Sequence, residues 1–153
     1  MATRTQAREV ALQVLFQDDL NPRSNPAIAD QMIEERLADG PTVEFARDLV
    51  AGVRRHRREI DEAIATAAAN WSLGRMAATD RAVLRIGVYE VLHAGTPAAV
   101  AIDEAIELAR RFGTAQSAQF VNGILDAIVQ TTKQEPPMNA DERDGQIPKS
   151  PNP

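Results

Sequence analysis

The sequence predicts an all-helical protein. Apolar residues recur with the 3.6-residue period of a helix along most of the chain, and no segment alternates apolar and polar residues as a strand does. Alanine, the strongest helix former, is abundant, whereas aromatic residues make up only 4% of the 153 residues. A chain of this length usually forms one domain that needs neither a disulfide nor a metal for its stability.

The ends of the helices follow from their start and stop signals. Asn25 before Pro26 is typical of a helix cap and first helical residue, and Thr96 before Pro97 repeats the pattern. We expect helices over residues 3–20, 26–40, 41–70, 79–94, 97–113 and 117–130. The third is expected to bend near Gly52. The fourth is apolar nearly all round, which is typical of a helix in the middle of a bundle.

Composition divides the chain into two parts. Residues 1–132 form the predicted helical domain, whereas residues 133–153 are rich in proline and charge and have almost nothing to bury. Such a segment cannot offset the entropy of its own ordering, so we expect a disordered tail.

The composition also excludes several kinds of site and location. The chain has no cysteine, which excludes disulfides, thiolate metal ligands and cysteine nucleophiles. The first residues are too polar for a signal peptide, and no apolar run approaches the roughly 18 residues that span a bilayer. We therefore expect a cytoplasmic protein without a membrane partner.

The net charge of −5 argues at first against a nucleic-acid partner. Both lysines, Lys133 and Lys149, lie in the tail, so the basic residues of the domain are arginines. Guanidinium groups bind phosphate through two hydrogen bonds and stack on bases, which suits a few local RNA contacts. An arginine-rich genome would explain the same bias equally well.

The helix over residues 97–113 has a clean amphipathic pattern. Its expected core stripe consists of Ala98, Ala101, Ile102, Ala105, Leu108, Ala109 and Phe112. Asp103, Glu104 and Glu107 fall outside the stripe, so we interpret them as a solvated face and not as catalytic carboxylates. No nucleophile elbow, phosphate-binding glycine loop or HExxH motif is present, and we expect no catalytic residue and no cofactor.

The spacing of Glu90 and His93 is one that helical bundles use to bind paired irons. That site needs a second Glu-x-x-His motif, but Val53 stands three residues before His56, the other histidine. We therefore expect no metal site. His93 near a helix C-terminus is explained by its favourable interaction with the helix dipole.

Three segments are candidates for RNA contact. Arg54–Arg58 is the densest basic run, although its side chains point in all directions around a helix and acidic residues follow it. In the first helix, Arg4 and Arg8 flank the apolar stripe, and Phe16 lies about 160° around the helix from Val14. An aromatic ring near arginines can stack on an unpaired base, but Phe16 could equally pack on a second buried face.

The third candidate lies in the last helix, where Asn122 and Gly123 interrupt an apolar pattern. Both are weak helix formers, which indicates either close packing at Gly123 or a functional polar group at Asn122. Gln119 and Phe120 stand beside them at the edge of the stripe. They are plausible base contacts, and helix packing explains the phenylalanine equally well.

Several separated motifs together resemble those of the NusB family. They are Trp71, DRAVLRIGVYE (80–90), VAIDEAIELARRFG (100–113) and FVNGILD (120–126), and REVALQVLFQ (8–17) is similar to the family's first helix. The resemblance covers roughly residues 3–130. It implies two small packed helical bundles with about six to seven helices.

The resemblance also implies a function without catalysis. NusB-type proteins pair with the ribosomal protein NusE and bind the boxA element of single-stranded nascent RNA, within the RNA polymerase antitermination complex. The implied RNA-facing residues are Arg4, Arg8, Phe16, Phe112, Gln119, Phe120 and Asn122. Asp80 and Arg81 would face NusE. For Phe112 the resemblance disagrees with the periodicity, which places this ring in the core.

Three alternatives keep the helical fold. NusB-like domains also precede ribosomal RNA methyltransferase domains, but this sequence continues into the proline-rich tail and not into an α/β domain. A helical adaptor without an RNA role would have the same periodicity. A metal-dependent enzyme built on a helical bundle is the third alternative. Separately, a homodimer that covers the arginine-bearing helix is compatible with the sequence.

Overall fold

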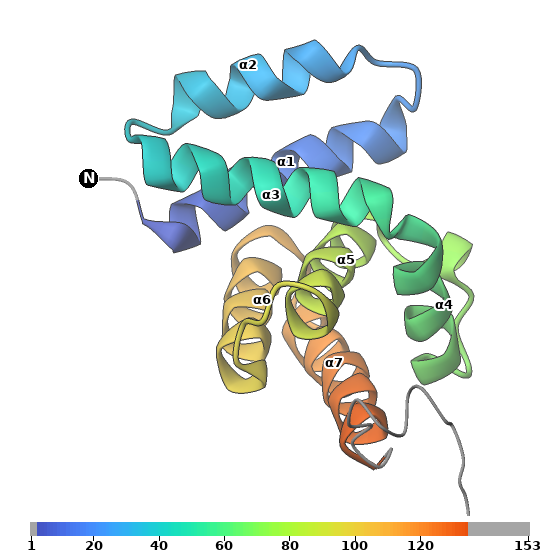
Figure 1. Cartoon of the computed structure of the whole chain (residues 1–153). Helices are drawn as coiled ribbons and strands as arrows, with labels where there is room; N and C mark the ends of the chain where they lie inside the picture. Colours follow the sequence, from blue (N-terminus) through green and yellow to red (C-terminus); the bar gives the residue numbers. More distant parts are fainter. Residues whose placement is uncertain (1–2, 135–153) are drawn as a thin grey trace, which may run out of the picture.

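A computed structural model describes residues 3–134, which form seven α-helices and one short 3-10 helix (Figure 1). The elements are α1 (Arg4–Leu20), α2 (Pro26–Arg36), α3 (Gly40–Arg55), α4 (Arg57–Ala67), η1 (Leu73–Arg75), α5 (Ala78–Leu92), α6 (Ala98–Phe112) and α7 (Ser117–Gln134). The described part contains no strand, so the predicted all-helical class is confirmed. None of these helices is long and apolar enough to cross a membrane.

The helices form two groups, as Figure 1 shows. The first group is α1, α2 and α3, and the second is α4 to α7, with α5 packed against α1, α3, α4, α6 and α7. Residues 82–90 of α5 are all buried, including Arg85 and Glu90. The prediction of a central helix from its all-round apolar character is therefore confirmed.

The start of α3 differs from the prediction. Asp39 accepts a hydrogen bond from the backbone N–H of Thr42 at 3.0 Å and caps a helix that begins at Gly40, where the sequence predicted the end of α2. Pro41 is tolerated in this first turn because its missing N–H would have no helical partner. Helix α2 ends at Arg36, four residues earlier than expected.

The predicted helix over residues 41–70 is two helices, and its break lies at His56 and not at Gly52. Gly52 is buried inside α3, and a Cβ atom built there would lie 2.1 Å from a ring carbon of Tyr89. The glycine therefore serves close packing against α5. The second helix ends at Ala67, short of Asn70.

The tail that was predicted over residues 133–153 lies almost entirely outside the described residues. Helix α7 includes Lys133 and Gln134, so the helical domain extends two residues past the expected boundary.

A buried ion pair joins α1 to the C-terminal half of α5. Arg8 donates from Nε and Nη2 to the two carboxylate oxygens of Glu90, both at 2.7 Å, and the two side chains are 5% and 1% exposed. Arg8 Nη1 donates to Glu104 of α6 at 3.1 Å, and Thr96 donates to Glu90 at 2.9 Å. Burial alone would lower the pKa of Arg8, but hydrogen bonds and charge from Glu90 and Glu104 raise it.

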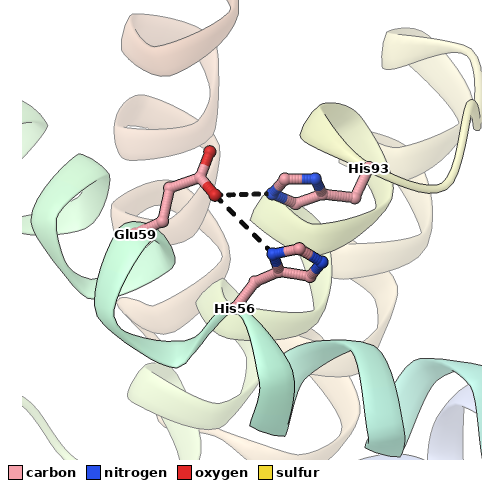
Figure 2. A group of neighbouring side chains, drawn as sticks. All are labelled: His56, Glu59 and His93. Atoms are coloured by element: carbon pink, nitrogen blue, oxygen red, sulfur yellow. Dashed lines mark ion pairs between the residues drawn. The ribbon is translucent and has the colours of Figure 1, made fainter.

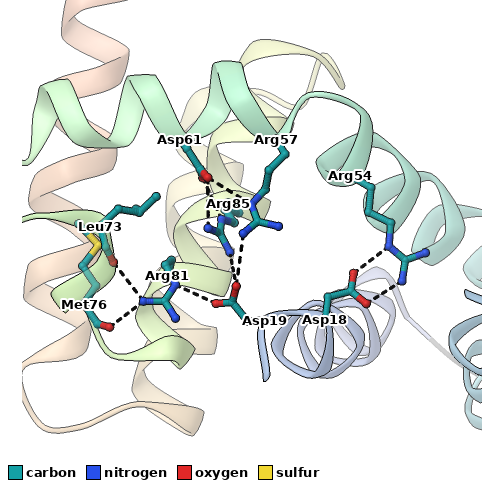
Figure 3. Close-up of polar contacts among 9 residues, drawn as sticks. All are labelled: Asp18, Asp19, Arg54, Arg57, Asp61, Leu73, Met76, Arg81 and Arg85. Carbon is teal, nitrogen blue, oxygen red and sulfur yellow. Dashed lines mark hydrogen bonds and ion pairs between the residues drawn. The ribbon is translucent and has the colours of Figure 1, made fainter. Parts of the chain in front are cut away.

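A second cluster joins the other end of α1 to the first half of α5 (Figure 3). Asp19 accepts hydrogen bonds from Arg81 at 2.8 Å and Arg85 at 3.0 Å, and Arg85 is also paired with Asp61 of α4 at 2.9 Å. Burial alone would raise the pKa of Asp19, but the hydrogen bonds and charges of the two arginines lower it below its ordinary value.

The two clusters determine how α1 is placed. Arg8 pairs with residue 90 and Asp19 with residues 81 and 85, so α1 and α5 run in opposite directions. At 100° per residue, Arg8 and Asp19 lie within about 20° of each other around α1. One face of α1 is thus held against α5 at both ends.

The buried ion pair yields a test of stability. Arg8→Met is expected to lower the free energy of unfolding by about 3–5 kcal/mol, because it leaves the Glu90 carboxylate buried without its cation. Arg8→Met/Glu90→Leu should recover most of the loss, since neither charge then remains buried. Urea denaturation of the three proteins measures this. A double variant less stable than the single variant would contradict the explanation.

Asp19 yields a test of acid stability. Its folded pKa lies below its ordinary value of 3.8, so its stabilisation is complete above that value and is lost as the pH falls through the folded pKa. Asp19→Asn should cost about 1.5–3 kcal/mol at pH 7, and its deficit should shrink as the pH falls below 3.8 and through the folded pKa of Asp19. The matched control is Asp18→Asn, whose pair with Arg54 is more exposed, and we expect at most about 1 kcal/mol for it. A deficit of Asp19→Asn that stays constant with pH would refute this account.

Candidate nucleic-acid interface

Two phenylalanines from different helices meet at a surface pocket. Phe16 near the end of α1 and Phe112 at the end of α6 line an open hollow of about 300 Å³. The other lining residues are Leu12, Gln13, Gln17, Met32, Arg36 and Thr79. We refer to this hollow as the phenylalanine pocket. It joins a residue of the first helical group to one of the second.

The placement of Phe112 in the core stripe was wrong. Phe112 is 39% exposed, whereas Leu108, one turn earlier, is 1% exposed. Phe112 is the last residue of α6, and the helix ends there before Gly113. The guanidinium of Arg111 lies 5.2 Å from the centre of the Phe112 ring. A ring that is partly open to solvent and lies beside a cation can stack on a base.

Phe16 is half-buried. The sequence left open whether this ring stacks on a base or packs on a second buried face, and the observed exposure lies between the two. Leu12 and Met32 line the same pocket, so the ring stands in a largely apolar surrounding.

The two arginines of α1 have different environments. Arg4 is exposed, and its guanidinium lies 4.7 Å from the centre of the Phe45 ring. Arg8 is 4% exposed and is paired with Glu90 and Glu104. The expectation that Arg8 faces RNA is therefore corrected, because its guanidinium is buried and is held by two carboxylates. Periodicity could not distinguish an edge position from a buried ion pair.

The candidates in α7 lie near a second aromatic pair. Phe120 is half-buried and packs edge to face with Trp71, with ring centres 5.9 Å apart, and Trp71 is 56% exposed. Gln119 and Asn122 are exposed on the same helix. A Cβ atom on the neighbouring Gly123 would meet nothing within 4 Å, so close packing does not explain this glycine.

The arginine run at 54–58 is partly neutralised by α1. Arg54 donates to both oxygens of Asp18 at 2.8 Å, and Arg57 lies 3.4 Å from Asp19 and 3.2 Å from Asp61 (Figure 3). The acidic partners come mainly from a distant segment, which the sequence alone did not indicate. The run does not form one free basic surface.

The residues expected to face NusE differ in their availability. Arg81 is 17% exposed and donates to Asp19 and to the backbone carbonyls of Leu73 and Met76, which makes it a structural residue (Figure 3). Asp80 is half-buried, and its Oδ1 atom is buried without a hydrogen-bond partner in the described part of the chain.

Two arginines near the phenylalanine pocket were missed. Arg36 lines the pocket and donates to Gln13, and Arg111 is paired with Glu9 of α1. The position of Arg111 directly before Phe112 at a helix end was a signal that could have found it. Arg36 could not have been found, because its approach to α1 depends on the packing of α2.

The comparison with known proteins decides the family. The profile described as the NusB family matches residues 5–130. The chain belongs to the NusB family. The transcription antitermination protein NusB of Symbiobacterium thermophilum is 44% identical over 140 residues, which cover 86% of this chain and 92% of that protein.

Solved structures agree with this assignment. NusB of T. maritima is 38% identical and has a TM-score of 0.76, with 84% of this chain and 92% of that chain covered. A chain in a structure of the antitermination factors NusB and NusE in complex with double-stranded RNA is 28% identical, with a TM-score of 0.76. It covers 84% of this chain and 96% of that one. The resemblance that the sequence motifs indicated is thus confirmed.

The new placement of Phe112 can be tested by stability. Leu108→Ala should cost about 2–5 kcal/mol, as expected for a fully buried leucine in a core. Phe112→Ala should cost less than about 1.5 kcal/mol, although it removes more atoms, because part of the ring is already in water. Thermal unfolding of the two variants compares them directly. An equal or larger loss of stability for Phe112→Ala than for Leu108→Ala would show that the Phe112 ring is part of the core.

Proposed function

We propose that this chain is a transcription antitermination factor that binds boxA-type single-stranded RNA together with NusE. The observation that carries the proposal is the phenylalanine pocket, in which two rings from different helices are presented beside Arg36 and Arg111. Membership of the NusB family and the similarity to NusB antitermination proteins support the same function.

The physical role of the pocket is to hold unpaired bases. Stacking of a base on an aromatic side chain contributes about 1–3 kcal/mol and tolerates many sequences. Phe16 and Phe112 supply such planes, and the exposed amides of Gln119 and Asn122 can hydrogen-bond to base edges. The Trp71–Phe120 pair offers a further ring surface. The chain needs no catalytic group for this role, so we propose that it is not an enzyme.

The supply of positive charge limits what the chain can do alone. With Arg8 buried, the guanidinium groups at the phenylalanine pocket are those of Arg36 and of Arg111, which is also paired with Glu9. Arg4 is exposed at the start of the helix that carries Phe16. Two to four phosphate contacts correspond to a slope of log K against log salt of about −1.4 to −2.8 on single strands. We therefore propose weak binding by the isolated chain and additional contacts from NusE. Since nascent bacterial transcripts lie in the cytoplasm, the proposed site of action is cytoplasmic.

The proposal is tested by titrating labelled boxA RNA with this chain, with and without NusE. We expect a weak complex for the chain alone and a markedly lower dissociation constant when NusE is present, because the partner supplies phosphate contacts. The slope with salt should be shallow for the chain alone. Equal dissociation constants in the two titrations would exclude the proposed cooperation with NusE.

The role of the pocket is tested in the same assay by Phe112→Ala. Loss of one stacked base corresponds to a dissociation constant raised by roughly 5- to 150-fold. Val100→Ala is the matched control, because Val100 is an apolar residue of the same helix that is 44% exposed and lies at its other end. If both variants bind RNA like the unchanged chain, bases do not stack in the phenylalanine pocket. A helical adaptor without an RNA role would then be favoured.

A further inference from the structure

Two histidines and a glutamate from different parts of the chain converge at the joint between α3 and α4 (Figure 2). His56 is the residue between these helices, Glu59 lies in the first turn of α4, and His93 caps the C-terminus of α5. His56 and His93 are the two histidines of the whole chain. The two histidines are 37 residues apart in the sequence, which predicted no metal site because a second Glu-x-x-His motif is missing.

The Glu90–His93 motif does not form this group. Glu90 is turned towards Arg8 and is fully buried, whereas His93 is turned towards His56 and Glu59. The dipole explanation of His93 still applies, since it stands at the end of α5. It does not account for the second imidazole and the carboxylate beside it.

The donor atoms have the separations of a metal site. Glu59 Oε1 lies 3.0 Å from His93 Nε2 and 3.7 Å from His56 Nδ1, and the possible ligand atoms of all three residues lie within 4.8 Å of one another. Zinc bonds of about 2.0–2.2 Å to nitrogen and oxygen place two ligands of a tetrahedral ion about 3.3 Å apart. The two measured separations lie on either side of this value.

The two rings lie together beside one carboxylate, but they are stacked, and a shared ion requires one imidazole to turn, because a metal ion lies in the plane of each imidazole that binds it. The imidazoles are stacked, with centres 3.8 Å apart and planes inclined by 12°, and Figure 2 shows a nitrogen of each turned towards the same carboxylate oxygen. The ring of Tyr89 lies 6.2 Å from His56 and 6.0 Å from His93, and this buried ring packs on Gly52. The buried ring of Tyr89 is thus a neighbour of both imidazoles.

The group is open enough for an ion to enter. The side chains of His56 and His93 are 30% and 23% exposed, and that of Glu59 is 56% exposed. A cation held by these three ligands would keep a position for water. Two imidazoles and one carboxylate form a set of ligands that binds Zn²⁺ and neighbouring divalent transition metals better than Mg²⁺ or Ca²⁺.

We propose that His56, Glu59 and His93 form a binding site for a divalent transition-metal ion of the Zn²⁺ type. The bound ion ties the joint between α3 and α4 to the end of α5. Because the unfolded chain does not hold these residues together, binding stabilises the folded state. This site shares no residue with the proposed RNA surface, so the two proposals can fail separately.

The test is a titration of the full chain with Zn²⁺ in the presence of a weak competing chelator, followed by thermal unfolding. We expect one ion per chain and a rise of Tm with Zn²⁺. His93→Ala and Glu59→Gln should each weaken binding by at least about 10- to 100-fold, the loss that even an indirect partner of a metal ligand causes. Glu62→Gln is the matched control, because it removes the same charge from an exposed position on α4.

Co²⁺ provides a readout of the ligands themselves. Its visible absorption should be strong in the unchanged chain and in Glu62→Gln, and lost in His56→Ala/His93→Ala. Circular dichroism shows whether the double variant is folded; if it is not, Glu59→Gln alone decides. Absence of stoichiometric Zn²⁺ binding, or equal binding by Glu59→Gln and Glu62→Gln, would overturn the proposal.

Discussion

The ion pair of Arg8 with Glu90 is the contact on which the placement of α1 depends. Both side chains lie in the interior, where the loss of either partner leaves a charge without solvent, so their geometry is strongly restricted. Asp19 repeats the arrangement eleven residues later with Arg81 and Arg85. Two links on one face of α1 fix its rotation as well as its position. Phe16 lies about 80° around the helix from Arg8, and the same links therefore turn it towards the phenylalanine pocket.

The charges of the domain act mainly within the fold. Arg8, Arg54, Arg57, Arg81 and Arg85 all have carboxylate partners in other helices or, for Arg57, also within α4. A net charge of −5 and a surface for RNA are compatible for this reason, because the arginines that stabilise the fold do not have to supply the phosphate contacts. The surface beside the rings of the phenylalanine pocket therefore carries little positive charge and offers aromatic area for stacking. Under the proposed function, such a surface would recognise bases without binding every polyanion strongly, which suits a factor that acts with a partner.

The sequence predicted the helical class, the central position of α5 and the family, because each depends on periodicity or on short local motifs. It failed where the answer depends on which helices meet. Arg8 lies at the edge of an apolar stripe, and only the carboxylate of Glu90, 82 residues away, decides that it is interior. Phe112 follows the period of the core but is the last residue of α6 and is 39% exposed. The break at His56 was assigned to Gly52 because glycine is a weak helix former, whereas the ring of Tyr89 requires that glycine inside the helix.

These features act on one degree of freedom, the position of the first helical group relative to the second. The phenylalanine pocket takes Phe16 from one group and Phe112 from the other, so its width follows any displacement between them. The two ion-pair clusters join α1 to α5 across this boundary, and the chain itself crosses it at His56. A metal ion held by His56, Glu59 and His93 would add a third link at the crossing. The residues that hold the two groups together are thus different from the residues that would touch RNA, and they determine whether the two rings stand at the spacing that stacked bases require.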